Sequence, residues 1–132
     1  MIDIEPEIYT KIRNAIKAEY PNAYISNLPL NKPTEFPAIS FVEAENMPTA
    51  RTADNEKVER TVDLMYEAQI FSVAENKKTE CRKILSIIDS VMYDYNFLKI
   101  LGAPISNLVD TSVYRMIGRY TAIADNKNIY RR

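Results

Sequence analysis

Carboxylates and arginines on predicted strands are the side chains of this chain that could carry out acid–base chemistry. The acids that strands could bring together are Glu43, Glu45, Asp63 and Glu67. Paired carboxylates of this kind can act as a general acid and a general base. Arg115 and Arg119 fall on the mixed face of a later strand, however, so cross-strand ion pairs would explain both sets without any reaction. We predict ion pairing, with an active site as the alternative.

The residue types that most hydrolytic and nucleotide-binding sites use are scarce in this sequence. It has no histidine, which removes the commonest general base and metal ligand together with Ser-His-Asp and Cys-His nucleophiles. The two glycines, Gly102 and Gly118, lie outside any phosphate-binding motif. A polar loop carries Asp54, Glu56 and Glu59, which lack calcium-loop spacing and could hold a hard cation only loosely. We predict no catalytic site, no metal and no cofactor.

Length and composition indicate one ordinary domain, spanning residues 1–132. Hydrophobic residues make up 46% of the 132 residues, which is enough for one core. Seventeen basic and eighteen acidic side chains leave a net charge of -1, so we expect no membrane partner and no sequence-specific nucleic acid. The single cysteine, Cys81, excludes an internal disulfide, and the N-terminus lacks an apolar run. We expect folding in the cytoplasm.

Two segments have the periodicity of amphipathic helices. The first, residues 4–19, follows the expected cap Asp3 and stops before Pro21; its apolar stripe consists of Ile4, Ile8, Ile12, Ala15 and Ile16. The second follows the expected cap Asn76 and has a broad apolar stripe from Cys81 to Tyr95. The polar residues opposite that stripe are Lys78, Arg82, Lys83, Asp89 and Asp94.

Strand patterns occupy most of the remaining chain. The predicted strands are residues 22–27, 38–45, 60–73, 97–101 and 111–124. Three prolines make residues 27–37 a stiff connection, residues 46–58 form a long polar loop, and residues 102–110 form another connection. The order of elements predicts an α+β fold, with a mixed or mainly antiparallel sheet of about five strands and two helices on one face.

The last predicted strand has two different faces. Its inward face is Tyr114, Met116, Gly118, Tyr120, Ala122 and Ala124, whose small members would let a helix approach closely. Its opposite face is Val113, Arg115, Ile117, Arg119 and Thr121. Tyr66, Tyr95, Tyr114 and Tyr120 are expected in the core or at its rim rather than on a nucleic-acid platform. The core is predicted to end near residue 124, which leaves a basic tail at residues 125–132.

Charge is distributed unevenly along the chain. Residues 43–67 hold seven acids and three bases, whereas residues 115–132 hold five bases and one acid, Asp125. In a monomer these segments could pair internally. In a ring, the acidic segment of one subunit could instead meet the basic end of the next. The sequence leaves both alternatives open.

Three stretches, "FPAISFVEAEN", "KKTECRKILSIIDSVMYDYNF" and "PISNLVDTSVYRMIGRYTAIADNKNIYRR", resemble the tail-terminator or tail-completion proteins of long, non-contractile-tailed bacteriophages and prophages, often labelled minor capsid proteins. The resemblance covers about three quarters of the chain, from residue 36 to the end. It implies a sheet flanked by helices, six copies of which form a ring. That ring would cap the head-proximal end of the tail tube and join the tail to the head.

The resemblance also implies a place and partners for the protein. We expect a structural protein, not an enzyme, located in the virion tail and bound to further copies of itself, to the tail tube protein and to the head–tail connector. The residues expected at these interfaces are Met47, Arg51, Asp54, Glu56, Arg60, Arg115, Arg119, Tyr130, Arg131 and Arg132. The alternatives are a head-completion or stopper protein of the connector, and a small ligand-binding or enzymatic domain with a pocket beneath Arg115 and Arg119.

Overall fold

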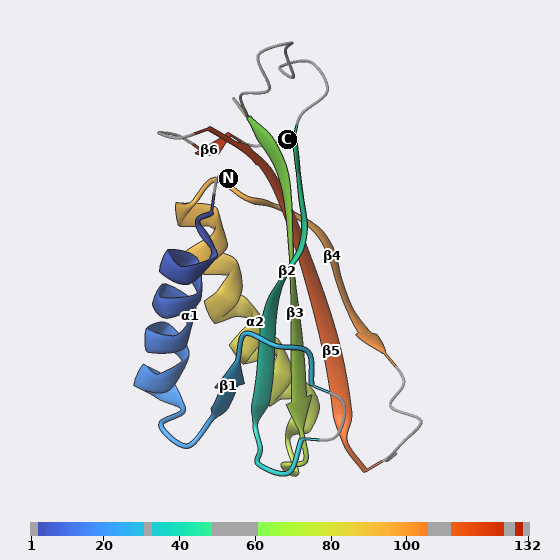
Figure 1. Cartoon of the computed structure of the whole chain (residues 1–132). Helices are drawn as coiled ribbons and strands as arrows, with labels where there is room; N and C mark the ends of the chain where they lie inside the picture. The colour runs from blue at the N-terminus through green and yellow to red at the C-terminus, as the bar shows by residue number, and fades with distance from the viewer. Residues whose placement is uncertain (1–2, 31–32, 49–60, 106–111, 126–128, 131–132) are drawn as a thin grey trace.

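The computed structural model describes residues 3–30, 33–48, 61–105, 112–125 and 129–130. Two helices and six strands occur in this described part (Figure 1). In chain order they are α1 (Glu5–Glu19), β1 (Tyr24–Ser26), β2 (Ala38–Pro48), β3 (Val62–Ser72), α2 (Lys77–Asp94), β4 (Leu98–Ile105), β5 (Tyr114–Ala124) and β6 (Ile129–Tyr130). The predicted α+β class is confirmed.

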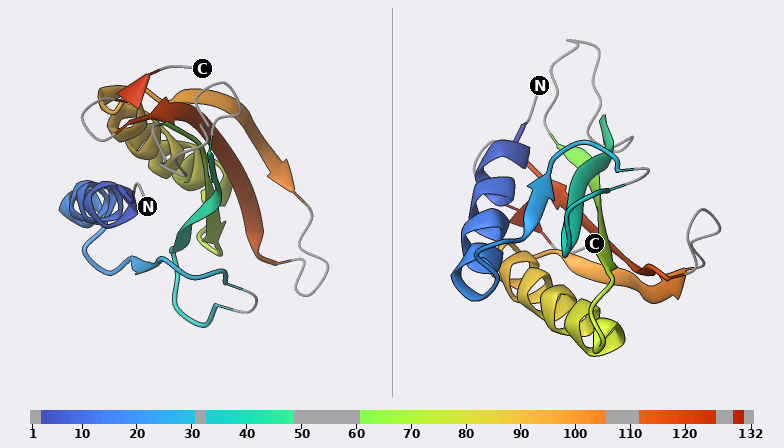
Figure 2. Two further views of the ribbon diagram at one scale, coloured as in Figure 1. Left: turned by 45° about the horizontal axis from the view of Figure 1, so that its top comes forward. Right: turned by 90° about the horizontal axis from the view of Figure 1, so that it is seen from below.

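The strands form one mixed sheet in the order β1-β2-β3-β5-β4, and the short β6 pairs with β5. Strand β1 runs parallel to β2, and the other neighbouring strands are antiparallel. Both helices lie against the same face of this curved sheet, as predicted (Figure 2). No helix of the described part is both long and apolar enough to cross a membrane.

Helix α1 forms because its apolar residues recur every fourth position. Ile8, Ile12 and Ile16 are completely buried against the sheet and α2. Pro6 lies in the first turn, where the missing N–H is tolerated, and the helix ends before Pro21. The cap position is Ile4 rather than Asp3, although the Asp3 carboxylate accepts a hydrogen bond from the Glu5 N–H at 3.3 Å.

Helix α2 buries the predicted stripe through Cys81, Ile84, Leu85, Ile88 and Met92. Asn76 holds the predicted cap position, but its side chain makes no capping hydrogen bond. Its backbone carbonyl instead accepts the Glu80 N–H at 2.9 Å. The helix therefore depends on its buried face more than on its N-terminal cap.

The centre of the core is an aromatic cluster on the helix-covered sheet face. Val62, Leu64, Tyr66, Ala68 and Ile70 all point inward from β3, as predicted from their alternation. Tyr66 stacks on Phe41 of β2, with 5.2 Å between ring centroids, and meets Phe97 edge-on at 5.4 Å. Tyr120 is buried as well, and Tyr95 and Tyr114 are partly buried around this core. The predicted placement of these tyrosines is confirmed.

Gly118 of β5 lets α2 approach the sheet closely. A Cβ atom built on Gly118 would lie 2.7 Å from Leu85 Cδ1, a distance that real Cβ contacts do not reach. The neighbouring Tyr120 donates a hydrogen bond from its hydroxyl to Asp89 of α2. The predicted close approach of a helix to the small residues of this strand therefore occurs, and it occurs at the turn of α2 that contains Leu85 and Asp89.

Strand β4 is longer than predicted, because residues 102–105 continue it instead of forming a connection. Gly102 pairs opposite Gly118, and Pro104 pairs opposite Met116. Proline and glycine normally indicate the end of a strand, but proline is tolerated where the strand lies at the edge of a sheet. Since β5 is the only strand that pairs with β4 in the described part of the chain, Pro104 fits the free side of β4. Strand β2 likewise runs to Pro48, three residues into the predicted loop.

The prediction that the core ends near residue 124 is wrong, because β6 adds to the sheet. Tyr130 pairs with Ile123, and Ile129 pairs with Ala124 and packs against the core. The Ile129 carbonyl also accepts a hydrogen bond of 3.0 Å from the Asn96 side chain, just after α2. A strand of two residues is too short to show a periodicity, so the sequence pattern could not reveal it.

Gly118→Ala should destabilise the protein, because the added methyl overlaps Leu85 where α2 meets β5. We expect a loss of about 1–3 kcal/mol in the free energy of unfolding, as for other overpacked sites. A double-mutant cycle with Leu85→Ala, followed by denaturant unfolding, measures the coupling. In the Leu85→Ala background, Gly118→Ala should lower the free energy of unfolding by a much smaller amount. An equal cost in both backgrounds would show that the Leu85 contact is not the cause.

Truncation after Asp125 should also lower the melting temperature, because it removes β6 and the carbonyl that Asn96 contacts. The matched control removes only residues 131 and 132, which leaves Ile129 and Tyr130 in place. Thermal unfolding of the two truncated proteins and the full chain gives the comparison. A melting temperature that is unchanged in the longer truncation would mean that β6 contributes nothing to the fold.

Candidate interaction surface

The sheet face that no helix of the described part covers carries the two predicted arginines. We call it the open face and define it by Glu67 and Gln69 of β3 and by Arg115, Ile117 and Arg119 of β5. The register of β3 and β5 places these residues side by side. At one end of this face, Leu30 and Phe36 from the proline-rich connection pack against a small cluster of Ala38, Phe71 and Val113.

Arg119 forms the predicted cross-strand ion pair. Its Nε lies 3.2 Å from Oε1 of Glu67, the residue directly opposite it on β3. The Arg119 side chain is 45% exposed and that of Glu67 is 18% exposed. A pair as open to water as this one contributes at most about 1 kcal/mol. Its main effect is therefore to orient Arg119 rather than to stabilise the sheet.

Arg115 is held differently, by an amide and an aromatic ring. Its Nε donates to Gln69 Oε1 at 3.1 Å, and its Nη2 donates to the same oxygen. The guanidinium lies 5.2 Å from the centroid of the Phe71 ring, which is a cation–π distance. Both arginines thus have partners within the same chain, and the positive charge of Arg115 faces no described carboxylate at ion-pair distance.

The alternative, in which Glu43, Glu45, Asp63 and Glu67 would gather for acid–base chemistry, is not supported for Glu43, because a β-bulge separates it from Glu45. Glu43 pairs opposite Tyr66, whereas Glu45 pairs opposite Met65, and the register shifts between the two acids. Glu43 therefore lies on the helix-covered face, where it accepts hydrogen bonds of 3.1 Å from the Tyr66 hydroxyl and from Asn46. Glu45 lies on the opposite face. Two of the four acids considered for acid–base chemistry are thus on opposite sides of the sheet.

Large apolar side chains are exposed at both edges of the sheet. At the β4 edge, Leu98, Ile100 and Leu101 are 39%, 49% and 37% exposed; we call them the β4 edge patch. At the β1 edge, Tyr24 and Leu28 are 38% and 67% exposed. These residues were not singled out in the sequence, because an apolar residue on a short strand is normally taken as core. Met47, a predicted interface residue near the end of β2, is exposed as well.

Several predicted interface residues lie outside the described part of the chain. These are Arg51, Asp54, Glu56, Arg60, Arg131 and Arg132. The backbone of Tyr130 belongs to β6. Of the predicted set, the structure therefore places Met47, Arg115 and Arg119, with both arginines on the open face.

The described residues contain no group of three or more metal-ligating side chains. The one cysteine, Cys81, is buried against β3 and β5, with weak contacts from its sulfur to the Ile70 and Tyr114 carbonyls. Burial, followed by the nearby charge of Glu80, raises the pKa of Cys81 to about 12. The thiol is therefore protonated at neutral pH and is a poor nucleophile.

A cavity of about 410 Å³ lies between α2 and β4, on the helix side of the sheet. Arg82 and Asp89 line it from α2, and Lys99 lines it from β4. Neither Arg115 nor Arg119 borders this cavity, so it is not the pocket that the ligand-binding alternative required. The helical periodicity of the sequence predicts that Arg82 and Asp89 lie on the solvent side of the helix. Their spacing with Ser86, at i, i+4 and i+7, was the signal that they share a face.

Acidic side chains meet where α1 begins. The pKa of Glu5 is raised above its usual value of 4.5, first by partial burial and then by the charges of Glu43 and Asp3. The helix N-terminus favours a negative charge, but the raised pKa shows that burial and the neighbouring acids outweigh it. An acid whose pKa is raised in the folded state lowers stability once it ionises. The penalty is absent below the unfolded pKa and fully present above the folded pKa.

Glu5→Gln should therefore raise the melting temperature at pH 7, and the gain should disappear as the pH falls toward about 4. Glu7→Gln is the matched control, because Glu7 lies exposed in the same first turn. This control loses only the favourable interaction with the helix N-terminus. Thermal unfolding at several pH values separates the two effects. A Glu5→Gln protein that is less stable than the wild type at pH 7 would contradict the prediction.

Two comparisons with known proteins found no match for this chain. No protein-family model matches it. No curated protein matches it either. The function of these surfaces is therefore argued from their geometry and from the sequence resemblance alone.

Proposed function

We propose that this protein is a structural virion component, a tail terminator that forms a ring on the head-proximal end of a phage tail tube and joins the tail to the head connector. The proposal combines the resemblance of residues 36–132 with the exposed apolar residues at the two sheet edges. In this proposal the protein works by binding, without catalysis or a cofactor. Its partners are further copies of itself, the tail tube protein and the connector.

The observation that carries the proposal is the pair of apolar sheet edges. A ring needs two different surfaces on each subunit, because each subunit contacts its neighbours head to tail. The β1 edge carries Tyr24 and Leu28, and the β4 edge carries Leu98, Ile100 and Leu101. These edges lie at opposite ends of the strand order. We propose that the β4 edge patch of one subunit contacts the β1 edge of the next subunit.

The charged part of the open face, which Leu98 and Leu101 of the β4 edge patch border, suits a separate partner. Arg115 and Arg119 are fixed in orientation by Gln69 and Glu67, so little side-chain freedom is lost when a partner binds. The charge on Arg115 is not neutralised by its neutral partners, Gln69 and Phe71. An acidic surface on the tail tube or on the connector would complement it.

A charged residue in the β4 edge patch should block assembly. We expect Leu101→Lys to shift the native mass from that of an oligomer to that of a monomer, because the lysine would carry its charge into an apolar contact. Val73→Lys is the matched control, since Val73 is exposed but does not belong to either sheet edge. Native mass at several concentrations, with electron microscopy of tail tubes polymerised in the presence of each protein, gives the readout.

The proposal is contradicted if the wild-type protein is a monomer at every concentration and also leaves the length of the tubes unchanged. Association that persists equally in the Leu101 and Val73 variants would refute the assigned edge while leaving ring formation standing. Co-purification distinguishes the tail terminator from the stopper alternative, because a stopper would bind the portal-side connector rather than the tube.

A further inference from the structure

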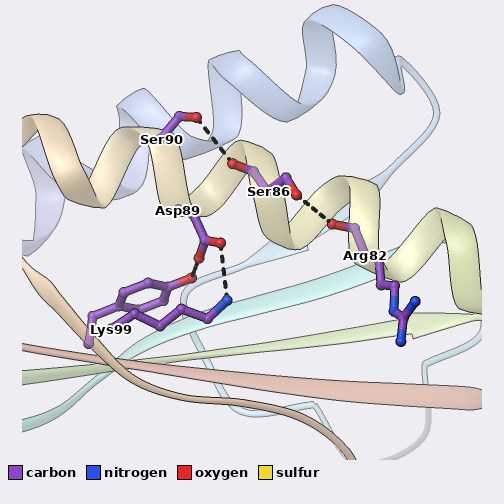
Figure 3. Close-up of polar contacts among 6 residues, drawn as sticks. Arg82, Ser86, Asp89, Ser90 and Lys99 are labelled. Atoms are coloured by element: carbon purple, nitrogen blue, oxygen red, sulfur yellow. Dashed lines mark hydrogen bonds and ion pairs between the residues drawn. The ribbon is translucent and has the colours of Figure 1, made fainter.

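Among the residues that the structure describes, those lining the cavity between α2 and β4 carry more positive than negative charge. Arg82, Ser86 and Asp89 border it from one side of α2, and Lys99 and Gly102 border it from β4. Figure 3 shows Lys99 reaching Asp89, while the Arg82 side chain extends from the same helix nearby. The lining therefore holds two cations and one carboxylate. Its volume of about 410 Å³ falls in the range of small-molecule sites.

The one carboxylate in the cavity is already fully engaged. Asp89 Oδ2 accepts from Lys99 Nζ at 3.1 Å, and Asp89 Oδ1 accepts from the Tyr120 hydroxyl. Burial, followed by this hydrogen bond, raises the pKa of Tyr120 well above its usual value, so the phenol is a permanent donor at neutral pH. Asp89 thus neutralises Lys99 and anchors Tyr120, and it makes no contact with Arg82.

Of the two cations that line the cavity, Arg82 is the one that no described carboxylate pairs with. Its guanidinium makes no ion pair or hydrogen bond with any residue in the described part of the chain. Its backbone carbonyl, by contrast, accepts the Ser86 hydroxyl at 3.0 Å, which uses the only proton of that hydroxyl. The donors left for a ligand are therefore the guanidinium fork of Arg82 and the remaining ammonium protons of Lys99. Together they suit an oxyanion that can accept two parallel hydrogen bonds.

Apolar side chains form part of the cavity wall and limit what that anion can be. They are Leu85 of α2, Pro104 of β4 and Met116 of β5. Gly102 makes room for the Lys99 side chain, because a Cβ atom built there would lie 2.5 Å from Lys99 Cε. A group with one negative charge and a short aliphatic stem would balance the excess charge and also bury the stem. A phosphate carries more charge than the cavity lacks and has no part that would contact the wall.

We infer that the cavity between α2 and β4 is a binding site for one carboxylate on a short aliphatic stem, held by Arg82 and Lys99. The group is that of a small aliphatic acid, or of a glutamate side chain of a second copy of this chain. Both sources would present the same groups to the site, a carboxylate and a short aliphatic stem. The inference does not depend on ring formation, because the cavity is complete within a single subunit.

The test is a titration of the isotope-labelled full-length protein with sodium butyrate at constant ionic strength, followed by nuclear magnetic resonance at the Arg82 Nε and Gly102 amide signals. We expect saturable shifts at these signals. Arg82→Gln should weaken the apparent affinity about tenfold, as expected when a charge-assisted hydrogen bond is lost. Lys83→Gln, which removes the same charge from the next, exposed position outside the cavity, should leave it unchanged. Gly102→Ala should also weaken binding, because the added methyl would displace the Lys99 side chain.

A second arm raises the protein concentration without butyrate, which detects a carboxylate supplied by another copy. Saturable shifts of the same signals in this arm, lost in Arg82→Gln, would assign the site to contacts between subunits. The inference is overturned by the absence of saturable shifts in both arms, by equal shifts in the Arg82→Gln protein, or by an equal or stronger response to inorganic phosphate. Arg82 is exposed, so its substitution should leave the melting temperature unchanged.

Discussion

The contact between α2 and β5 is the constraint on which the rest of the structure depends. Gly118 lets Leu85 approach the sheet, and the Tyr120 hydroxyl then reaches Asp89 on the next turn of the helix. A buried phenol without a partner would be costly, so this hydrogen bond fixes both the rotation and the height of α2 over β5. With α2 fixed there, α1 packs beside it on the same face. The opposite sheet face therefore has no helix over it in the part of the chain described.

The contact between α2 and β5 also constrains how β4 packs beneath α2. The Lys99 side chain extends from β4 and forms an ion pair with Asp89, which links the start of this edge strand to α2. Beyond the bulge between Lys99 and Leu101, the strand carries Gly102 and Pro104, whose small or rigid side chains do not fill the space beneath α2. The cavity and the exposed β4 edge patch thus have one cause. Strand β4 is attached to α2 at its start, and the rest of the strand is only partly covered by α2.

Sequence patterns predicted those parts of the fold that depend on periodicity. The alternation in β3, the stripe on α2 and the small inward residues of β5 repeat over several turns or residue pairs, so each could be read without the structure. Cross-strand pairing between the strand acids and the two arginines was also predicted, but its specific form, Glu67 opposite Arg119, depends on β3 and β5 being neighbours, which the sequence did not reveal. Single-residue events could not be predicted. The bulge after Glu43, the edge position that tolerates Pro104 and the two-residue β6 each depend on tertiary neighbours.

The candidate sites were harder to predict than the fold, for a related reason. An exposed arginine on a helix looks the same in sequence whether it faces bulk water or a cavity, and Arg82 differs from Lys83 only in what β4 places opposite it. The open face shows the converse case. Arg115 and Arg119 were recognised as unusual, yet Gln69 and Glu67 already satisfy part of their hydrogen bonding. A charge is informative about binding when its neighbours leave it uncompensated, and by that criterion Arg82 and Arg115 are better suited to an external partner than Arg119 is.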